Sequence, residues 1–260
     1  LWARSLALPS ARVTFFNFLA SHDGIGLNPV RGILSDAEIE ALVRRTLEHG
    51  GFISYKDMPD GTRLPYEMNI NYLDALSNPA EREPAEVAAR KFLTAHAILL
   101  SLQGVPGIYF HSLFGSRGDR AGAEASGIPR RINREKLDRA RLEAELSEAR
   151  SLRGCIWRGL KQLVQVRSAA SAFHPQAAQR VLVTDGRVFA VCRTPSETEE
   201  RVLCLHNVSA QPVSVTGPLT EVASVATWTD LLTGRRYGGR GSPAVELAGF
   251  QTLWLRAENP

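Results

Sequence analysis

The residues best suited to chemistry are His22 and Asp23, which directly follow an apolar run and precede Gly24 and Gly26. The run, residues 15–20, predicts a buried strand, because strands covered on both faces are nearly continuously apolar. His and Asp at the carboxyl end of such a strand face the loops in which α/β enzymes place their catalytic groups. The pattern indicates an active-site rim. The alternative is a capped strand end with a satisfied histidine.

Other side chains that could contact a ligand lie in loop segments: Tyr66, Glu67, Arg117 and Arg134. Each has a structural alternative, namely loop packing for Tyr66 and Glu67, a solvated charge for Arg117, and an ion pair with an acid on the following helix for Arg134. The charged series from 130 to 153 is typical of a solvent-exposed helix face. Without a GxSxG segment, the Ser, Cys and His residues indicate no catalytic triad.

Composition excludes several classes of function. The 31 Lys and Arg residues outnumber the 27 Asp and Glu residues only slightly, and they are scattered, so a nucleic-acid interface is not indicated. Cys155, Cys192 and Cys204 are odd in number and lack zinc-ligand spacing, which favours a reducing, cytoplasmic location. The longest apolar stretch, residues 95–102, is much shorter than the ~20 residues that span a membrane.

The order of elements resembles a barrel followed by a β domain. After the first strand, Ser35 and Glu38 form a capping box for a helix that ends at Gly50. Residues 52–78 show no helical periodicity and predict a long connection, which in a compact domain is usually functional. A helix over 85–103, a strand over 105–110, a glycine-rich loop, a helix in which Glu135 pairs with Arg139, and a helix ending near 167 follow. Short alternating segments from about residue 179, with Asp185-Gly186 as a hairpin turn, predict antiparallel strands.

We therefore predict an α/β fold, the C-terminal part of a (β/α)8 barrel over residues 1–177, followed by a small antiparallel all-β domain, sandwich-like, over residues 178–260. Only two barrel strands can be counted, whereas a complete barrel has eight and typically takes about 250 residues. The chain also begins with Leu1 in what resembles the tail of a helix. A fragment of a longer protein is the expectation.

Several motifs together resemble the α-amylase superfamily of glycoside hydrolases, specifically the branch of sucrose phosphorylase and related glucoside phosphorylases. Their order and spacing match those of the family, with the first and third as barrel strands seven and eight. The motifs are Phe18-Leu-Ala-Ser-His-Asp-Gly-Ile-Gly26, Tyr66-Glu-Met-Asn-Ile-Asn-Tyr-Leu-Asp-Ala-Leu76, Leu102-Gln-Gly-Val-Pro-Gly-Ile-Tyr-Phe110, Gly115-Ser-Arg117 and Ile132-Asn-Arg134.

The resemblance implies roles for the candidate residues. Asp23 would be the carboxylate that stabilises the oxocarbenium-like transition state, with His22 donating a hydrogen bond to the same glucose. Arg134 would fix the nonreducing end of the glucose, and Tyr66 could reach an anionic oxygen. Glu67 replaces the Gln usual in sucrose phosphorylases, which favours acceptors other than fructose, such as glycerate, and Arg117 would pair with an anionic acceptor.

The implied activity is transfer of a glucosyl group from a small glucoside to phosphate, with no metal or organic cofactor and inorganic phosphate as co-substrate. The family's nucleophile and acid/base lie on strands four and five, so the 260 residues alone are expected to be inactive. A hydrolase or transglucosidase is the nearest alternative. A noncatalytic carbohydrate-binding module, with Trp157, Trp228 and Trp254 as stacking surfaces, is the alternative from another class. The sequence does not indicate an oligomeric state.

Overall fold

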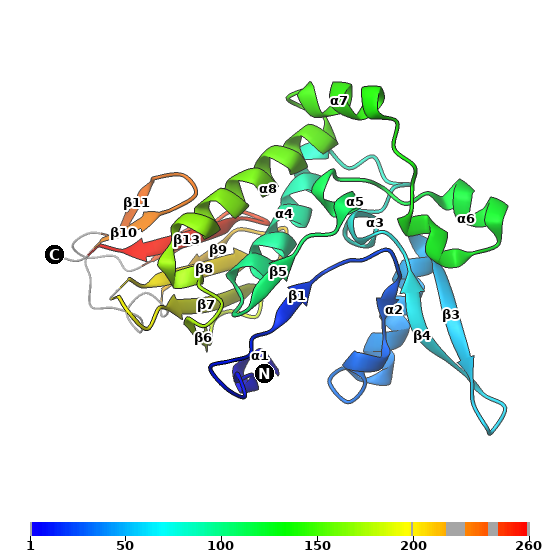
Figure 1. The fold of residues 1–260 in the computed structure, drawn as a ribbon, viewed down its shortest axis with the longest axis horizontal. Coiled ribbons are helices and arrows are strands. Elements are labelled where there is room, and N and C mark those ends of the chain that lie inside the picture. Colours follow the sequence, from blue (N-terminus) through cyan, green and yellow to red (C-terminus); the bar gives the residue numbers. More distant parts are fainter. Residues whose placement is uncertain (1, 199, 217–226, 239–243, 259–260) are drawn as a thin grey trace. The chain divides into compact units, whose positions relative to one another are not determined.

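The computed structural model describes residues 2–198, 200–216, 227–238 and 244–258. Parts of the predicted β domain, residues 217–226 and 239–243, lie outside the described residues. The elements up to residue 107 are α1 (Trp2–Ser5), β1 (Phe16–Phe18), β2 (Ile25–Gly26), η1 (Asn28–Val30), α2 (Asp36–Glu48), β3 (Phe52–Asp57), β4 (Arg63–Asn69), α3 (Tyr72–Leu76), α4 (Ala85–Ser101) and β5 (Val105–Gly107) (Figure 1). The later helices are α5 (Phe110–Leu113), α6 (Arg120–Ser126), η2 (Pro129–Asn133), α7 (Arg139–Ser147), α8 (Leu152–Ala169) and η3 (Ser171–Phe173). The later strands are β6 (Ala178–Leu182), β7 (Val188–Thr194), β8 (Val202–Asn207), β9 (Val213–Val215), β10 (Thr227–Asp230), β11 (Arg236–Gly238), β12 (Val245–Leu247) and β13 (Thr252–Ala257).

The chain divides into two compact units, and each is built from separate stretches of sequence. The first contains residues 1–17, 93–107 and 158–260, and the second contains residues 18–92 and 108–157. The helices α4 and α8 therefore contribute residues to both units. The predicted boundary between residues 177 and 178 stays a prediction.

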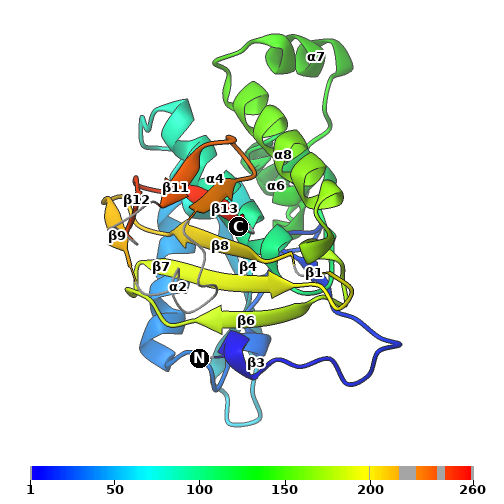
Figure 2. The ribbon, with the colours of Figure 1, turned by 90° about the vertical axis from the view of Figure 1, so that its left-hand side faces the viewer.

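The first unit is organised around a six-stranded antiparallel sheet of order β11-β10-β13-β8-β7-β6 (Figure 2). Its β6–β7 hairpin turns at Asp185-Gly186, as predicted from the sequence. The strands β9 and β12 form a separate antiparallel pair. Trp228 packs in the sheet's core and Trp254 is fully buried, so neither offers a sugar-stacking face at the surface.

The two strands predicted for the barrel, β1 and β5, are hydrogen-bonded neighbours in a two-stranded sheet. Both are shorter than predicted: β1 has three residues, and β5 ends at Gly107, because Phe110, the last residue of the third motif, begins α5. Gly104 lies between the two strands with a φ of 122°, and a Cβ there would be 2.6 Å from the carbonyl oxygen of Phe15. Only glycine permits this backbone conformation and this approach.

The prediction of a long connection over residues 52–78 was wrong, because the segment forms the β3–β4 hairpin and α3 (Figure 1). A β-bulge interrupts the pairing, with Ser54 opposite Glu67 and Tyr55 opposite Pro65, so that Tyr66 is the extra residue. Residues 67–70 are then consecutively buried. The bulge and this burial remove the period-2 alternation by which strands are identified.

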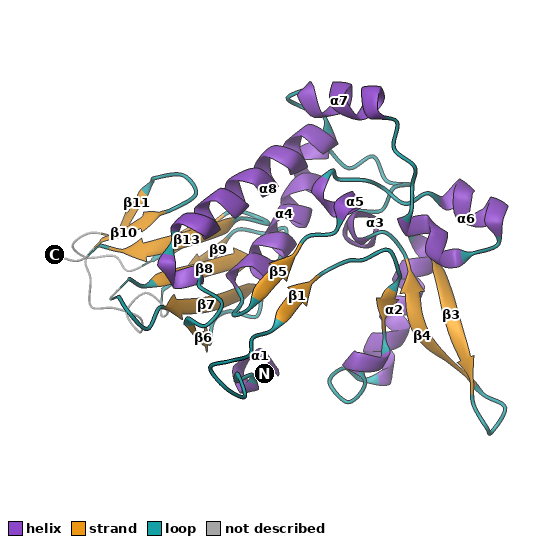
Figure 3. Ribbon diagram, in the orientation of Figure 1, coloured by secondary structure: helices purple, strands orange, loops and turns teal. Residues whose placement is uncertain are grey.

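The second unit also contains helices that the sequence interpretation missed or misplaced (Figure 3). The glycine-rich loop contains α6, with the Asp119 side chain as N-cap and Gly127 in the left-handed conformation after its last turn. The predicted pairing of Glu135 with Arg139 was wrong. Glu135 precedes α7 and pairs with Arg153, while Arg139 pairs with Glu143. By contrast, the predicted capping box of α2 at Ser35 is confirmed.

Candidate functional site

Asp23 lies where the chain leaves β1 and turns back to form β2. The strand β2 pairs with β4, with Gly26 opposite Glu67, and the Leu27 amide donates to the Tyr66 carbonyl over 2.8 Å. At Gly24, a Cβ would lie 2.6 Å from the Met68 carbonyl oxygen and 2.7 Å from Cγ of Glu67. Glycine permits this close approach. Two predicted motifs, 40 residues apart in sequence, are thereby held side by side.

The backbone around Asp23 is also held by the last residue of η2, Asn133, and by Arg134, which follows it. Arg134 Nε donates to the His22 carbonyl over 3.0 Å, and Asn133 Nδ2 donates to the Asp23 carbonyl over 2.9 Å. The Tyr109 hydroxyl in turn donates to the Asn133 carbonyl over 2.6 Å, and burial raises the pKa of Tyr109. Residues from β5's C-terminal side and from η2 therefore fix the turn that presents Asp23.

The Asp23 carboxylate receives two guanidinium groups. Arg134 Nη2 lies 3.2 Å and Arg130 Nη1 lies 3.5 Å from the same oxygen, Oδ1, and His22 Nε2 lies 3.6 Å from it. Arg130 Nε also donates to Glu67 Oε2 over 2.9 Å. This bond to Glu67 is the main reason that the pKa of Arg130 lies above its ordinary value. We call Asp23, Glu67, Arg130 and Arg134 the carboxylate–arginine cluster.

Exposure differs sharply within the cluster. The Glu67 side chain is 7% exposed, whereas those of Arg130 and Arg134 are 43% and 44% exposed and that of Asp23 is 36% exposed. His22 is more exposed still, at 66%. The cluster therefore turns Glu67 inward and presents Asp23 and the two guanidinium groups to solvent.

Arg130 and Asn133 were missed by the sequence interpretation. The charged series from 130 to 153 was assigned to a solvent-exposed helix face, and this holds for Arg139 and Arg141 on α7. It is wrong for Arg130, which precedes that helix and bridges two carboxylates, and for Arg153, whose side chain is 15% exposed and pairs with Glu135 and Glu145. The spacing of Arg130 and Arg134 was the available signal.

Arg117 has partners outside the cluster. Its Nη1 donates to Asp74 Oδ1 and to the Ser77 carbonyl, each over 2.8 Å, and the Gly118 amide donates to the other Asp74 oxygen over 2.7 Å. Burial raises the pKa of Asp74, and the bonds from Arg117 and Gly118 oppose that rise. The structure therefore groups His22, Asp23, Glu67 and Arg134, and it gives Arg117 a carboxylate partner of its own. Tyr66 joins the site through its backbone and its position in the bulge.

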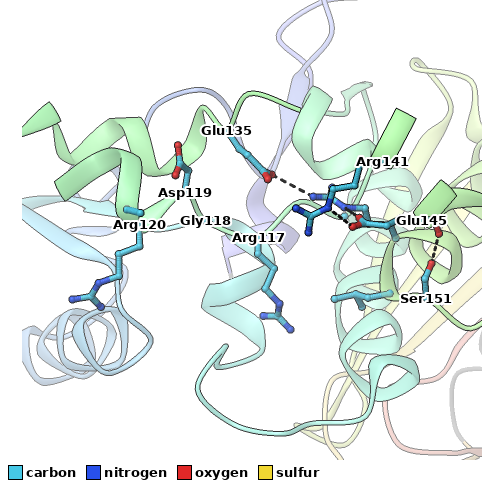
Figure 4. A pocket seen from close by; sticks show the side chains of 12 residues that line it. Arg117, Gly118, Asp119, Arg120, Glu135, Arg141, Glu145 and Ser151 are labelled. Carbon is cyan, nitrogen blue, oxygen red and sulfur yellow. Dashed lines mark hydrogen bonds and ion pairs between the residues drawn. The ribbon is translucent and has the colours of Figure 1, made fainter. Parts of the chain in front are cut away.

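Arg117 also lines a cavity of about 570 Å³ between α6, α7 and the start of α8 (Figure 4). Glu135, Arg141 and Glu145 lie together on one side of this cavity, and Arg120 points away from them. Its other charged groups are engaged as well, Arg141 with Glu145 and Arg120 with Glu124. No member of the carboxylate–arginine cluster lines this cavity.

Among the residues that the structure places, no group of three or more His, Cys, Asp or Glu side chains is arranged to hold a metal ion. Within the described ranges, no helix combines the length and apolar character needed to cross a bilayer. The expectations that neither a metal nor a cofactor is needed stay predictions.

Comparisons with known proteins agree with the motifs. The chain is 46% identical to the glucosylglycerate phosphorylase of Allomeiothermus silvanus over 98% of its own length, and it spans 42% of that relative's length. Among solved structures, it resembles the sucrose 6F-phosphate phosphorylase of Thermoanaerobacter thermosaccharolyticum, with a TM-score of 0.61 and 19% identity over 74% of this chain and 36% of that one. It also resembles the α-amylase of Geobacillus thermoleovorans, with a TM-score of 0.53 and 13% identity over 95% of this chain and 39% of that one. No model of a known protein family matches the chain.

The sequence similarity to the curated phosphorylases identifies the chain as a member of the α-amylase superfamily. The solved structures show the matching fold, that of (β/α)8 barrel proteins. Within that superfamily, the chain belongs to the branch of sucrose phosphorylase-like sugar phosphorylases and corresponds to the C-terminal part of such proteins. The predicted family and fold class are confirmed. The roles of the individual site residues stay predictions.

Proposed function

We propose that the chain is part of a retaining α-glucoside phosphorylase that converts a small glucoside and phosphate into α-glucose 1-phosphate. The observation that carries the proposal is the 46% identity to a glucosylglycerate phosphorylase over 98% of the chain. The carboxylate–arginine cluster supports it. Asp23, at the position that the family uses as a transition-state stabiliser, is partly exposed, and its backbone is held by hydrogen bonds from Asn133 and Arg134. A cytoplasmic location is part of the proposal, supported by three free cysteines.

In the proposed reaction, a carboxylate nucleophile of the enzyme attacks C1 of the glucosyl group while an enzyme acid protonates the departing oxygen. A phosphate oxygen then attacks the same carbon, and the carboxylate leaves. Positive charge develops on the sugar ring in both steps. The Asp23 carboxylate, held by Arg134 and by backbone bonds, stabilises that charge through the sugar hydroxyls without having to reorganise. His22, beside Asp23 and 66% exposed, donates to the same sugar.

The acceptor side is proposed to take glycerate in preference to fructose. Glu67 stands at the position where sucrose phosphorylases usually have Gln, and its carboxylate engages Arg130. Tyr66, in the bulge beside it, belongs to the same acceptor region. Arg117 stays a candidate for an anionic group, although its pairing with Asp74 must then be shared or exchanged.

The proposal is tested by incubating the complete protein with glucosylglycerate and phosphate. We expect α-glucose 1-phosphate and glycerate as products, with retention of the α configuration. Sucrose serves as the comparison substrate and should be the poorer one. Release of free glucose at the same rate with and without phosphate would instead identify a hydrolase.

A further inference from the structure

Arg130 is held at one end of its guanidinium group and open at the other. Its Nε donates to Glu67 and its Nη1 lies 3.5 Å from Asp23, while Nη2 has no hydrogen-bond partner among the described residues. The side chain is 43% exposed. A guanidinium offers five N–H donors in a planar fork that matches oxyanions, so an unused, exposed nitrogen beside a sugar-holding carboxylate is suited to bind one.

Glu67 fixes the direction of that fork. Its side chain is 7% exposed, it lies on β4 opposite Gly26, and its Cγ packs against Gly24. A carboxylate so enclosed cannot follow Arg130 if the arginine moves. The 2.9 Å bond from Arg130 therefore sets the orientation of the guanidinium group. Glu67 on this view is a positioning residue that acts through Arg130.

The charge arrangement favours an anion at this point. Within the carboxylate–arginine cluster two carboxylates face two guanidinium groups, yet Glu67 is turned inward and both arginines are more than 40% exposed. Asp23 keeps a closer cationic partner in Arg134, at 3.2 Å, so Arg130 is not needed to neutralise it. The outward side of the cluster is consequently rich in unused N–H donors.

We propose that Arg130 binds an oxyanion of the group that attacks or leaves the glucosyl carbon, and so selects anionic acceptors. The inference rests on the proposed function. Two sources share this chemistry, the carboxylate of glycerate and the oxygens of phosphate. Both would occupy the position next to the sugar held by Asp23, one after the other in the reaction sequence.

The test uses one neutral donor, α-glucosyl fluoride, with the complete protein and three acceptors in parallel: water, glycerate and phosphate. In Arg130→Gln, we expect KM for glycerate, for phosphate or for both to rise about 10- to 100-fold, as expected when a hydrogen bond to a charged group is lost. Hydrolysis of the donor by each variant is measured in parallel, so that a loss specific to the two anions is separated from a general loss of glucosyl transfer. Arg130→Lys keeps the charge without the fork and should recover part of the loss.

The controls separate the possible outcomes. Arg139→Gln removes the same charge from an exposed position on α7, and it should change neither of the two KM values for the anions nor the rate of hydrolysis. A rise confined to glycerate identifies the acceptor carboxylate as the ligand, and a rise confined to phosphate identifies the co-substrate. Unchanged KM values for both anions, or an equal fall in all three reactions, would overturn the inference. A wild-type protein that hydrolyses the donor but makes no α-glucose 1-phosphate would contradict the proposed function instead.

Discussion

Two groups of arginines in this chain differ in how deeply they are buried and in which groups accept their hydrogen bonds. In the carboxylate–arginine cluster, Arg130 and Arg134 are exposed and face carboxylates. In the first unit, Arg193 is fully buried and Arg167 is partly buried, and both donate to backbone carbonyl groups. The same side chain thus forms part of a candidate binding site in one unit and completes the hydrogen bonding of an interior in the other.

The buried pair closes the C-terminal end of α4. Arg193 Nη1 donates to the Ser101 carbonyl over 2.9 Å, and Arg167 donates to the carbonyls of Leu100 and Gly104. Further bonds from Arg193 reach the carbonyls of His174, Ala177 and Ala178. The last carbonyls of a helix have no intrahelical partner and carry partial negative charge, so cations are stabilising there.

The pKa values of the two buried arginines and of Arg130 shift in opposite directions. Burial lowers the pKa of Arg193 to about 10, and it also lowers that of Arg167, whereas the bond to Glu67 raises the pKa of Arg130. Carbonyl dipoles compensate a buried charge less completely than a carboxylate does. The comparison teaches that the buried arginines, which lack carboxylate partners, complete the hydrogen bonding of an interior, whereas Arg130 and Arg134 face the carboxylates of the candidate site.

The largest effect is expected from Asp23→Asn, which removes the negative charge of the exposed carboxylate in the carboxylate–arginine cluster. We expect kcat to fall about 10³-fold, about 4 kcal/mol of transition-state stabilisation, because a preorganised electrostatic partner of the developing positive charge is lost. The thermal midpoint should change little, since Asp23 is partly exposed. Steady-state kinetics on the complete protein measure the effect, and a loss confined to KM would argue against the assigned role.

Next in size is Arg193→Leu, which removes the fully buried arginine. Several carbonyls would lose their donor, and leaving buried polar groups unpaired costs about 1–3 kcal/mol. We expect a loss of about 3 kcal/mol in the free energy of unfolding, measured by denaturant titration. The kcat of the folded fraction should be unchanged. The matched control, Arg187→Leu at an exposed turn, should stay within about 0.5 kcal/mol of wild type.

A smaller effect is expected from Arg134→Gln, which spares both carboxylates of the cluster. The Asp23 carboxylate loses its closest guanidinium group, and the His22 carbonyl loses a donor. We expect kcat/KM to fall about 10- to 30-fold, corresponding to one charge-assisted hydrogen bond. Stability should stay near the wild-type value. If Arg134→Gln unfolded the protein as Arg193→Leu is expected to, the contrast between the two groups would fail.

The last prediction concerns pH, at His206 beside the buried arginines. Its ring contacts the Ser101 and Thr252 hydroxyls, and burial lowers its pKa from 6.5 to about 3. Because the unfolded chain binds this proton more readily, the stability contributed by neutral His206 is present above pH 6.5 and is lost as pH falls toward 3. One group contributes at most about 1.4 kcal/mol per pH unit.

The measurement compares unfolding free energies at pH 7, 6, 5 and 4 for the wild type and His206→Asn. Asn can replace both hydrogen bonds but does not titrate. The variant should therefore show a shallower decline between pH 6 and 4. Parallel slopes would mean that His206 does not experience the apolar interior that surrounds Arg193.

Much of the fold could be predicted because its signals are local. The capping box at Ser35, the apolar periodicity over residues 85–103 and the Asp185-Gly186 turn each specify their element within a few residues of sequence. The β3–β4 hairpin could not be predicted in the same way. Its bulge at Tyr66 and the continuous burial after it conceal the alternation of a strand.

The candidate site likewise contains residues that local motifs predicted and one residue, Arg130, that they did not. His22, Asp23, Glu67 and Arg134 were predicted because their residue types stand in motifs of recognisable order. The part played by Arg130 depends on a contact across 63 residues of sequence, to Glu67, and on the turn that brings Asp23 to the same place. Read along the chain, Arg130 and Arg139 are equivalent charges.

The amino-acid sequence by itself determined the family, the local elements and the chemical types available at the site, because these depend on residue identity and short spacing. Only the tertiary structure decided which carboxylate each arginine faces and which arginines face none. Those pairings require backbone segments to approach each other, at Gly24 beside β4 and at the end of α4. Such approaches depend on packing over long sequence separations, which residue order does not display.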